Sequence, residues 1–146
     1  MSSTTIGVGI SYRPQFLRSL LDLRLEVDHL EVLVEHSSYG GCISGQVKLL
    51  AERYPLVAHG VNQSFGTEHC RTRKAAVAAT SCLAREVGVR WIGDHIAATA
   101  DAVTNARQLL PVPRTEQLVR RIATNARALG RITGLPVVLE YIASSI

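Results

Sequence analysis

Acidic and imidazole side chains stand where apolar runs of this sequence end. The runs "HLEVLVE", "LVAHGV", "VRWIGD" and "PVVLE" carry at or just beside their carboxyl ends Glu35 with His36, His59, Asp94 with His95, and Glu140. Imidazole nitrogens and carboxylate oxygens together suit iron, manganese or zinc. Without a metal, the same groups could perform general acid–base chemistry, as in an isomerase. The spacing alone leaves both chemistries open.

The elements that must position these side chains alternate between short apolar runs and longer amphipathic stretches. Strands are expected at 5–10, 29–35, 56–61, 89–94 and 136–140, and helices at 15–23, 45–54, 72–88 and 114–134. This alternation is typical of βαβ units with a parallel sheet. Because the carboxyl ends of parallel strands meet at one edge, where α/β enzymes assemble their sites, we expect the polar side chains to lie together.

Some element ends can be assigned from single residues. Thr115 is suited to cap the amino end of the last helix, and Gly88 and Gly134 stand where helices need a left-handed residue. Residues 97–114 end in two prolines and are expected to form a long loop with at most a short helix.

Each polar side chain also has an ordinary structural interpretation. His59 could be a hydrogen-bonded residue at the sheet edge, Asp94 could bind turn amides, and Glu140 could pair with an arginine. His29 is expected at the opposite edge and His69 in a loop. A shared class of side chain at four strand ends favours a functional site over four unrelated coincidences.

Composition limits the function classes. The 146 residues are 47% hydrophobic and 19% charged, which predicts one folded domain over 1–146. The net charge of +4 comes from scattered arginines without an aromatic platform, which argues against nucleic-acid binding. Three cysteines without CxxC spacing argue against a disulfide framework or a structural zinc site and favour the cytoplasm. The absence of a signal sequence or a long apolar window argues against secretion and membrane insertion.

Taken in order, several motifs resemble the multinuclear non-haem iron-dependent oxidative enzymes, long described as a family of unknown function. They are "IGVGISYRPQF", "VDHLEVLVEHSSYGG", "YPLVAHGVNQSFG", "WIGDHIAAT", "LLPVPRTEQLVRRIATNARALG" and "LPVVLEYIASSI", and they cover nearly the whole chain. The resemblance implies a TIM barrel that binds two or three irons and uses dioxygen. It also implies peptide modification in natural product biosynthesis, acting on cysteine-containing ribosomal peptides, often with a partner protein that presents the peptide.

The resemblance also implies a ligand set. His59, His95 and Glu140 match iron-ligand positions, whereas Asp94 and Glu35 match residues at the same edge that either touch metal or orient the ligands. It assigns no further catalytic residue.

The chain departs from the family pattern in three respects. It is expected to supply about five of the eight barrel strands, Tyr141 stands where the family has asparagine, and His36 replaces another asparagine. An incomplete barrel leaves a strand edge unpaired. The chain is therefore expected to be a truncated product, to combine with a complementing polypeptide, or to self-associate.

Three functions stay open at this stage. The first is a partial iron-dependent oxidase. The second is a TIM-barrel isomerase or an endonuclease-like enzyme that uses manganese or zinc. The third is a non-catalytic remnant that acts as a binding module.

Overall fold

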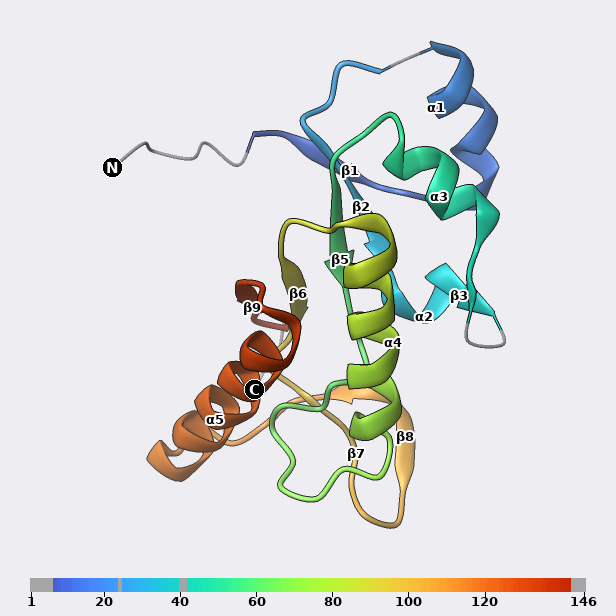
Figure 1. The fold of residues 1–146 in the computed structure, drawn as a ribbon. Helices are drawn as coiled ribbons and strands as arrows, with labels where there is room; N and C mark the ends of the chain where they lie inside the picture. Colours follow the sequence, from blue (N-terminus) through green and yellow to red (C-terminus); the bar gives the residue numbers. More distant parts are fainter. Residues whose placement is uncertain (1–6, 24, 40–41, 143–146) are drawn as a thin grey trace.

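The protein forms an open parallel sheet with helices packed against it. The computed structural model describes residues 7–23, 25–39 and 42–142. The sheet has the order β1 (Gly9–Ser11), β2 (His29–Leu33), β5 (Leu56–His59), β6 (Ile92–His95) and β9 (Val137–Glu140), with every pair parallel (Figure 1). Within the described residues, β1 and β9 each have one strand neighbour, so the barrel is not closed. The predicted class, parallel βα units of an incomplete TIM-type barrel, is confirmed.

The helices lie close to the expected ranges. They are a 3-10 turn (Pro14–Phe16), α1 (Leu17–Leu23), α2 (Val34–Ser37), α3 (Gly45–Ala51), α4 (Arg73–Val87) and α5 (Glu116–Thr133). The Thr115 side chain accepts a hydrogen bond from the Leu118 amide, and Gly88 and Gly134 have φ of 68° and 72°. The predicted caps are therefore confirmed. No helix in the described part of the chain is long and apolar enough to cross a membrane.

Two expectations about local structure are wrong. Residues 34–37 form the helical turn α2 instead of continuing the strand, because the Ser37 hydroxyl donates to the Leu33 carbonyl and closes the turn. Residues 97–114 are not a loop, because β7 (Ala98–Ala100) and β8 (Asn105–Leu110) pair as an antiparallel hairpin. A carboxylate oxygen of Asp101 accepts from the Val103 and Thr104 amides and forms its turn.

The amino-terminal strand and one short hairpin also differ from expectation. β1 begins at Gly9, and residues 5 and 6 of the expected strand lie outside the described residues. A second small antiparallel pair, β3 (Ser38–Tyr39) and β4 (Cys42–Ile43), joins α2 to α3. Two-residue strands of this kind carry too little periodicity to be recognised in a sequence.

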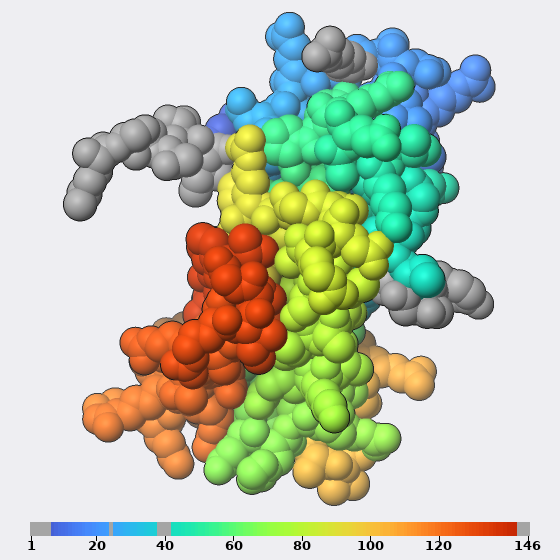
Figure 2. All heavy atoms as spheres, viewed as in Figure 1, coloured from blue at the N-terminus to red at the C-terminus, as the bar shows by residue number. Residues whose placement is uncertain are grey.

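The two faces of the parallel sheet have different environments. One face packs into the core with side chains from all the longer helices, and its residues are Leu30, Val32, Leu56, Ala58, Ile92, Val137 and Leu139. Because side chains alternate along a strand, Glu31, His59, His95 and Glu140 lie on the opposite face. Figure 2 shows α5 packed beside α4 on the helical side. The helices therefore cover the apolar face and leave the polar one free.

Candidate metal centre

Three neighbouring strands bring the candidate ligands together. His59 ends β5, His95 ends β6 and Glu140 ends β9. In the strand register His59 pairs with Gly93, and His95 pairs with Glu140. His95 therefore lies two residues beyond the partner of His59, on the same face, and directly beside Glu140. This arrangement is the convergence that the strand ends predict.

The three side chains form a compact donor cluster. One ligand atom from each of His59, His95 and Glu140 lies within 4.8 Å of the other two. The two imidazole rings meet edge to face with centroids 4.7 Å apart, and His95 Nε2 lies 3.9 Å from Glu140 Oε2. Two imidazoles and one carboxylate are a donor set that suits a first-row divalent cation. The residues present therefore fit a metal ion of this class.

Glu31 is a site residue that the strand-end pattern did not reveal. Its Oε2 lies 3.4 Å from His59 Nδ1, and its other carboxylate oxygen accepts from the Ser11 hydroxyl. The hydrogen bond with His59 is the main cause that lowers the pKa of Glu31 to about 2, and the same contact raises the pKa of His59. A carboxylate behind an imidazole fixes the ring and its tautomer, as in many metal sites.

Asp94 supports the site from the helical face. It is 1% exposed, and its carboxylate accepts from the backbone amides of Gln63 and His95. Its Oδ1 lies 3.7 Å from His95 Nδ1, a buried nitrogen without a hydrogen-bond partner in the described structure. A Cβ on Gly60 would lie 2.6 Å from Asp94 Oδ2, so glycine permits this close approach. Asp94 is thus placed to hold His95.

Glu35 lies outside the donor cluster, on α2. Its Oε1 accepts from the Val61 amide at 3.0 Å, and its Oε2 is buried without a partner among the described residues. It lines a cavity of about 400 Å³ between α2, the segment after β5 and the β7–β8 hairpin. Of the five residues expected at the site, the structure brings His59, His95 and Glu140 together, places Asp94 beside them and places Glu35 in this cavity.

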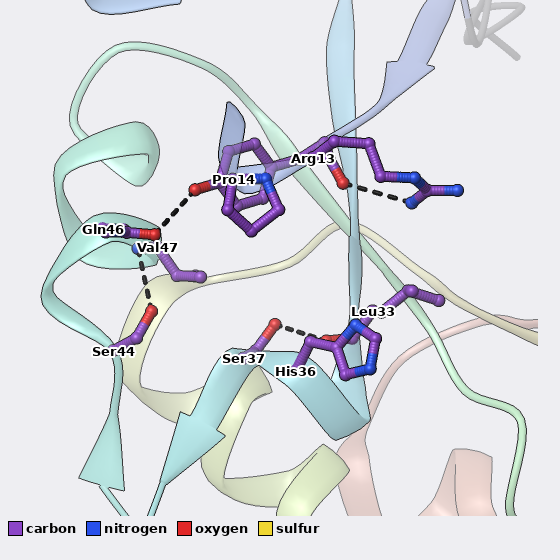
Figure 3. Close-up of a pocket in the computed structure, with 9 residues that line it drawn as sticks. Arg13, Pro14, Leu33, His36, Ser37, Ser44, Gln46 and Val47 are labelled. Carbon is purple, nitrogen blue, oxygen red and sulfur yellow. Dashed lines mark hydrogen bonds between the residues drawn. The ribbon is translucent and has the colours of Figure 1, made fainter. Parts of the chain in front are cut away.

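A second cavity lies at the same edge of the sheet, between the 3-10 turn, α2 and α3. It measures about 270 Å³, and Figure 3 shows Arg13 and Pro14 on one side with Ser37 and His36 on the other. His36 lines both cavities. The two cavities are therefore neighbours on either side of the α2 turn.

The segments that follow β5 and β6 are tied to each other. The Ser64 hydroxyl donates to the Ala100 carbonyl and accepts from the Thr99 and Ala100 amides. The Arg73 guanidinium donates to the carbonyls of Ser64 and Thr67 and thereby fixes the segment after His59. These contacts hold the chain beyond two of the donor residues in one position.

His29 and His69 lie where the sequence predicted them. His29 is the first residue of β2 and lies at the amino ends of the strands, opposite the donor cluster. Its ring is 5.0 Å from that of Trp91. The side chain of His69 is 83% exposed in the segment before α4. Neither belongs to the donor cluster.

The model of one protein family matches nearly the whole chain. The family is described as "RiPP precursor modification enzyme MbnB/TglH/ChrH", and the match covers residues 7–146. The chain belongs to this family. Membership confirms the resemblance drawn from the ordered motifs.

This member of the MbnB/TglH/ChrH family resembles several curated bacterial proteins that carry the name UPF0276. The chain is 32% identical to one from Caulobacter vibrioides over 92% of its length, 27% to one from Pseudomonas aeruginosa over 94%, and 28% to one from Streptomyces avermitilis over 97%. These matches cover 48%, 49% and 30% of the relatives. The chain therefore spans about half the length, or less, of the relatives it matches.

A solved structure supports the fold assignment. A crystal structure of D-psicose 3-epimerase with D-fructose matches 91% of this chain and 50% of that protein, with a TM-score of 0.57 and 17% identity. The likeness concerns the fold of this family member and not its activity.

Proposed function

We propose that this chain carries one side of an iron centre that oxidatively modifies cysteine-containing ribosomal peptides. His59, His95 and Glu140 are the proposed ligands. The convergence of one ligand atom from each within 4.8 Å carries the proposal. The family's description as a modification enzyme for ribosomal peptide precursors supports the substrate class.

The chain's own residues would prepare this site. Glu31 orients the His59 ring through Nδ1, and Asp94 supports His95 from the helical face. The Glu140 side chain is 61% exposed, so the cluster is open to solvent and to a substrate on the side of β9. Bound iron would supply the activation of dioxygen that oxidative chemistry requires.

Metal counting tests the ligand assignment. We would load the chain anaerobically with Fe²⁺, and in parallel with Mn²⁺ or Zn²⁺, and measure the bound metal in the wild type, His59→Ala and His95→Ala. We expect both variants to lose bound iron. His69→Ala is the matched control, because that side chain is exposed and lies outside the cluster. Equal metal content in all four proteins would refute the assignment.

Oxygen uptake tests the reaction class separately. The iron-loaded chain should consume dioxygen when it is mixed with a cysteine-containing peptide. It should not do so with the same peptide in which serine replaces cysteine. Peptide binding without oxygen consumption would instead support a binding module. Activity with Mn²⁺ or Zn²⁺ on a sugar, without oxygen uptake, would support an isomerase.

A further inference from the structure

The cavity between α2 and the β7–β8 hairpin contains two buried oxygens with unused hydrogen-bonding capacity. Glu35 Oε2 and Thr99 Oγ1 have no partner in the described structure, and Thr99 is 4% exposed. Both residues line the cavity. A buried polar atom without a partner is costly, and such atoms therefore mark positions where a ligand can form the missing bonds. We propose that this cavity binds the backbone of an extended peptide.

The lining chemistry fits a peptide backbone. The free carboxylate oxygen of Glu35 can accept a hydrogen bond from an N–H donor. The amides of Asn62, Asn105 and Gln108 provide donors and acceptors around the same cavity. An extended chain presents N–H and C=O groups in alternation. His36 and Arg107 add further donors to the lining. The set of side chains therefore offers donors and acceptors together, which matches alternating backbone groups better than it matches an apolar ligand.

The β8 strand, which forms one side of this cavity, has a residue with an uncommon backbone conformation. Arg107 has φ of 54°, in the left-handed region that non-glycine residues seldom adopt, and its amide donates to the Asn105 side chain. This conformation lies in the middle of β8, on the segment that lines the cavity. Strained backbone of this kind is often found where a ligand is held. It supports a binding role for this side of the cavity.

The cavity lies beside the candidate metal centre. Val61 and Asn62 follow His59 by two and three residues, and Thr99 follows His95 by four. Two to four residues span at most roughly 7–14 Å, so a peptide held here would lie close to the donor cluster. The second cavity, which also has His36 in its lining, lies on the other side of α2, beside Arg13 and Pro14 (Figure 3). The inference rests on the proposed function in taking this peptide to be the substrate.

Peptide titration of the full 146-residue chain without added metal tests the proposal. The probe is acetyl-Ala-Gly-Ala-Cys-Ala-Gly-Ala-amide, followed by amide NMR shifts. We expect shifts at Asn62, Thr99 and Gln108. The same peptide with a methyl group on each backbone nitrogen should not bind, because it lacks backbone N–H donors. Replacing its cysteine with alanine should leave the affinity unchanged.

Two variants remove the proposed contacts with little change of shape. Glu35→Gln places an NH₂ group or a neutral oxygen at the position of Oε2, and Thr99→Val removes the hydroxyl. Each should lower peptide affinity about tenfold. Thr99→Val should keep or raise Tm, because no hydrogen bond is lost, and this separates binding from folding. Glu52→Gln, at the exposed end of α3, is the control and should bind normally.

Two results would overturn the inference. One is equal binding of the normal and N-methylated peptides, and the other is unchanged affinity in both cavity variants. Peptide affinity is measured without metal, and metal content is measured without peptide. This proposal and the proposed function can therefore fail separately.

Discussion

His95 and Glu140 are direct partners in the register of β6 and β9, with Nε2 and Oε2 3.9 Å apart. Their surroundings differ, because the His95 side chain is 12% exposed and that of Glu140 is 61% exposed. The imidazole is largely enclosed by its surroundings, whereas the carboxylate is in contact with solvent. A cation that approaches the cluster therefore meets the exposed carboxylate on the open side and the enclosed imidazoles on the other.

Glu140→Gln should weaken iron binding while the fold is retained. The amide keeps the shape of the side chain but removes the negative charge that offsets the charge of the cation. We expect the Kd for Fe²⁺ to rise on the order of tenfold or more, measured by anaerobic titration. Glu116→Gln, at the start of α5, is the matched control. An unchanged Kd in Glu140→Gln would argue against a ligand role.

Glu31→Gln should also weaken iron binding, although Glu31 is not proposed as a ligand. The substitution weakens the contact with His59 Nδ1 that orients the ring. We expect about a tenfold rise in Kd for Fe²⁺, with the same number of metal ions bound at saturation. A loss of binding stoichiometry would instead indicate that Glu31 coordinates the metal directly.

Gly93→Ala should disturb His59 from the neighbouring strand. The new Cβ would lie 3.2 Å from His59 Nδ1, so the ring would have to move by a few tenths of an ångström. We expect weaker iron binding and a loss of about 1 kcal/mol in unfolding free energy, measured by urea denaturation. Gly45→Ala is the control, because nothing lies within 4 Å of a Cβ there. Normal iron affinity in Gly93→Ala would show that the ring tolerates the shift.

The β7–β8 turn should open in acid. Hydrogen bonds from the Thr104 and Val103 amides lower the pKa of Asp101 below its ordinary value of 3.8. A lowered folded pKa means that the ionised carboxylate stabilises the turn above about pH 3.8, and that this contribution disappears as the pH falls through the lower folded pKa. Hydrogen-exchange protection of these two amides should therefore fall in that range. In Asp101→Asn the protection of these amides should no longer depend on pH in this range. If the variant has the same pH profile of protection as the wild type, Asp101 is not the cause.

The β9 edge should promote association. Within the described residues β9 pairs with β6 alone, and Val138 on it is 49% exposed. An unpaired edge with apolar side chains favours pairing with another chain, and a lysine at such an edge opposes it. We expect concentration-dependent sedimentation that Val138→Lys reduces and Val103→Lys, at the hairpin turn, does not. A monomeric wild type across concentrations would contradict this prediction.

The sequence was sufficient to predict the parallel sheet and the order of its strands and helices, because β-branched runs and amphipathic stretches alternate clearly. It was also sufficient to suggest which strand ends meet, since parallel strands share one edge. His59, His95 and Glu140 converge for this reason. These predictions depend on periodicity and topology, which a single sequence records directly.

Glu31 and the β7–β8 hairpin could not be recognised in the same way. Glu31 lies inside a strand, and its role depends on the diagonal offset between β2 and β5 that brings it to His59. The alternation of Leu30, Glu31 and Val32 did contain a signal, because it places a lone carboxylate on the face away from the core. The hairpin depends on a short turn at Asp101 within a segment of weak strand character.

The donor cluster draws on strands that are far apart in the order of synthesis. His59 emerges from the ribosome about eighty residues before Glu140, and the carboxylate belongs to β9, the last parallel strand among the described residues. A nascent chain that stops short of β9 therefore carries both imidazoles without their carboxylate. A cation bound by all three donors would therefore stabilise only those chains in which β9 has paired with β6.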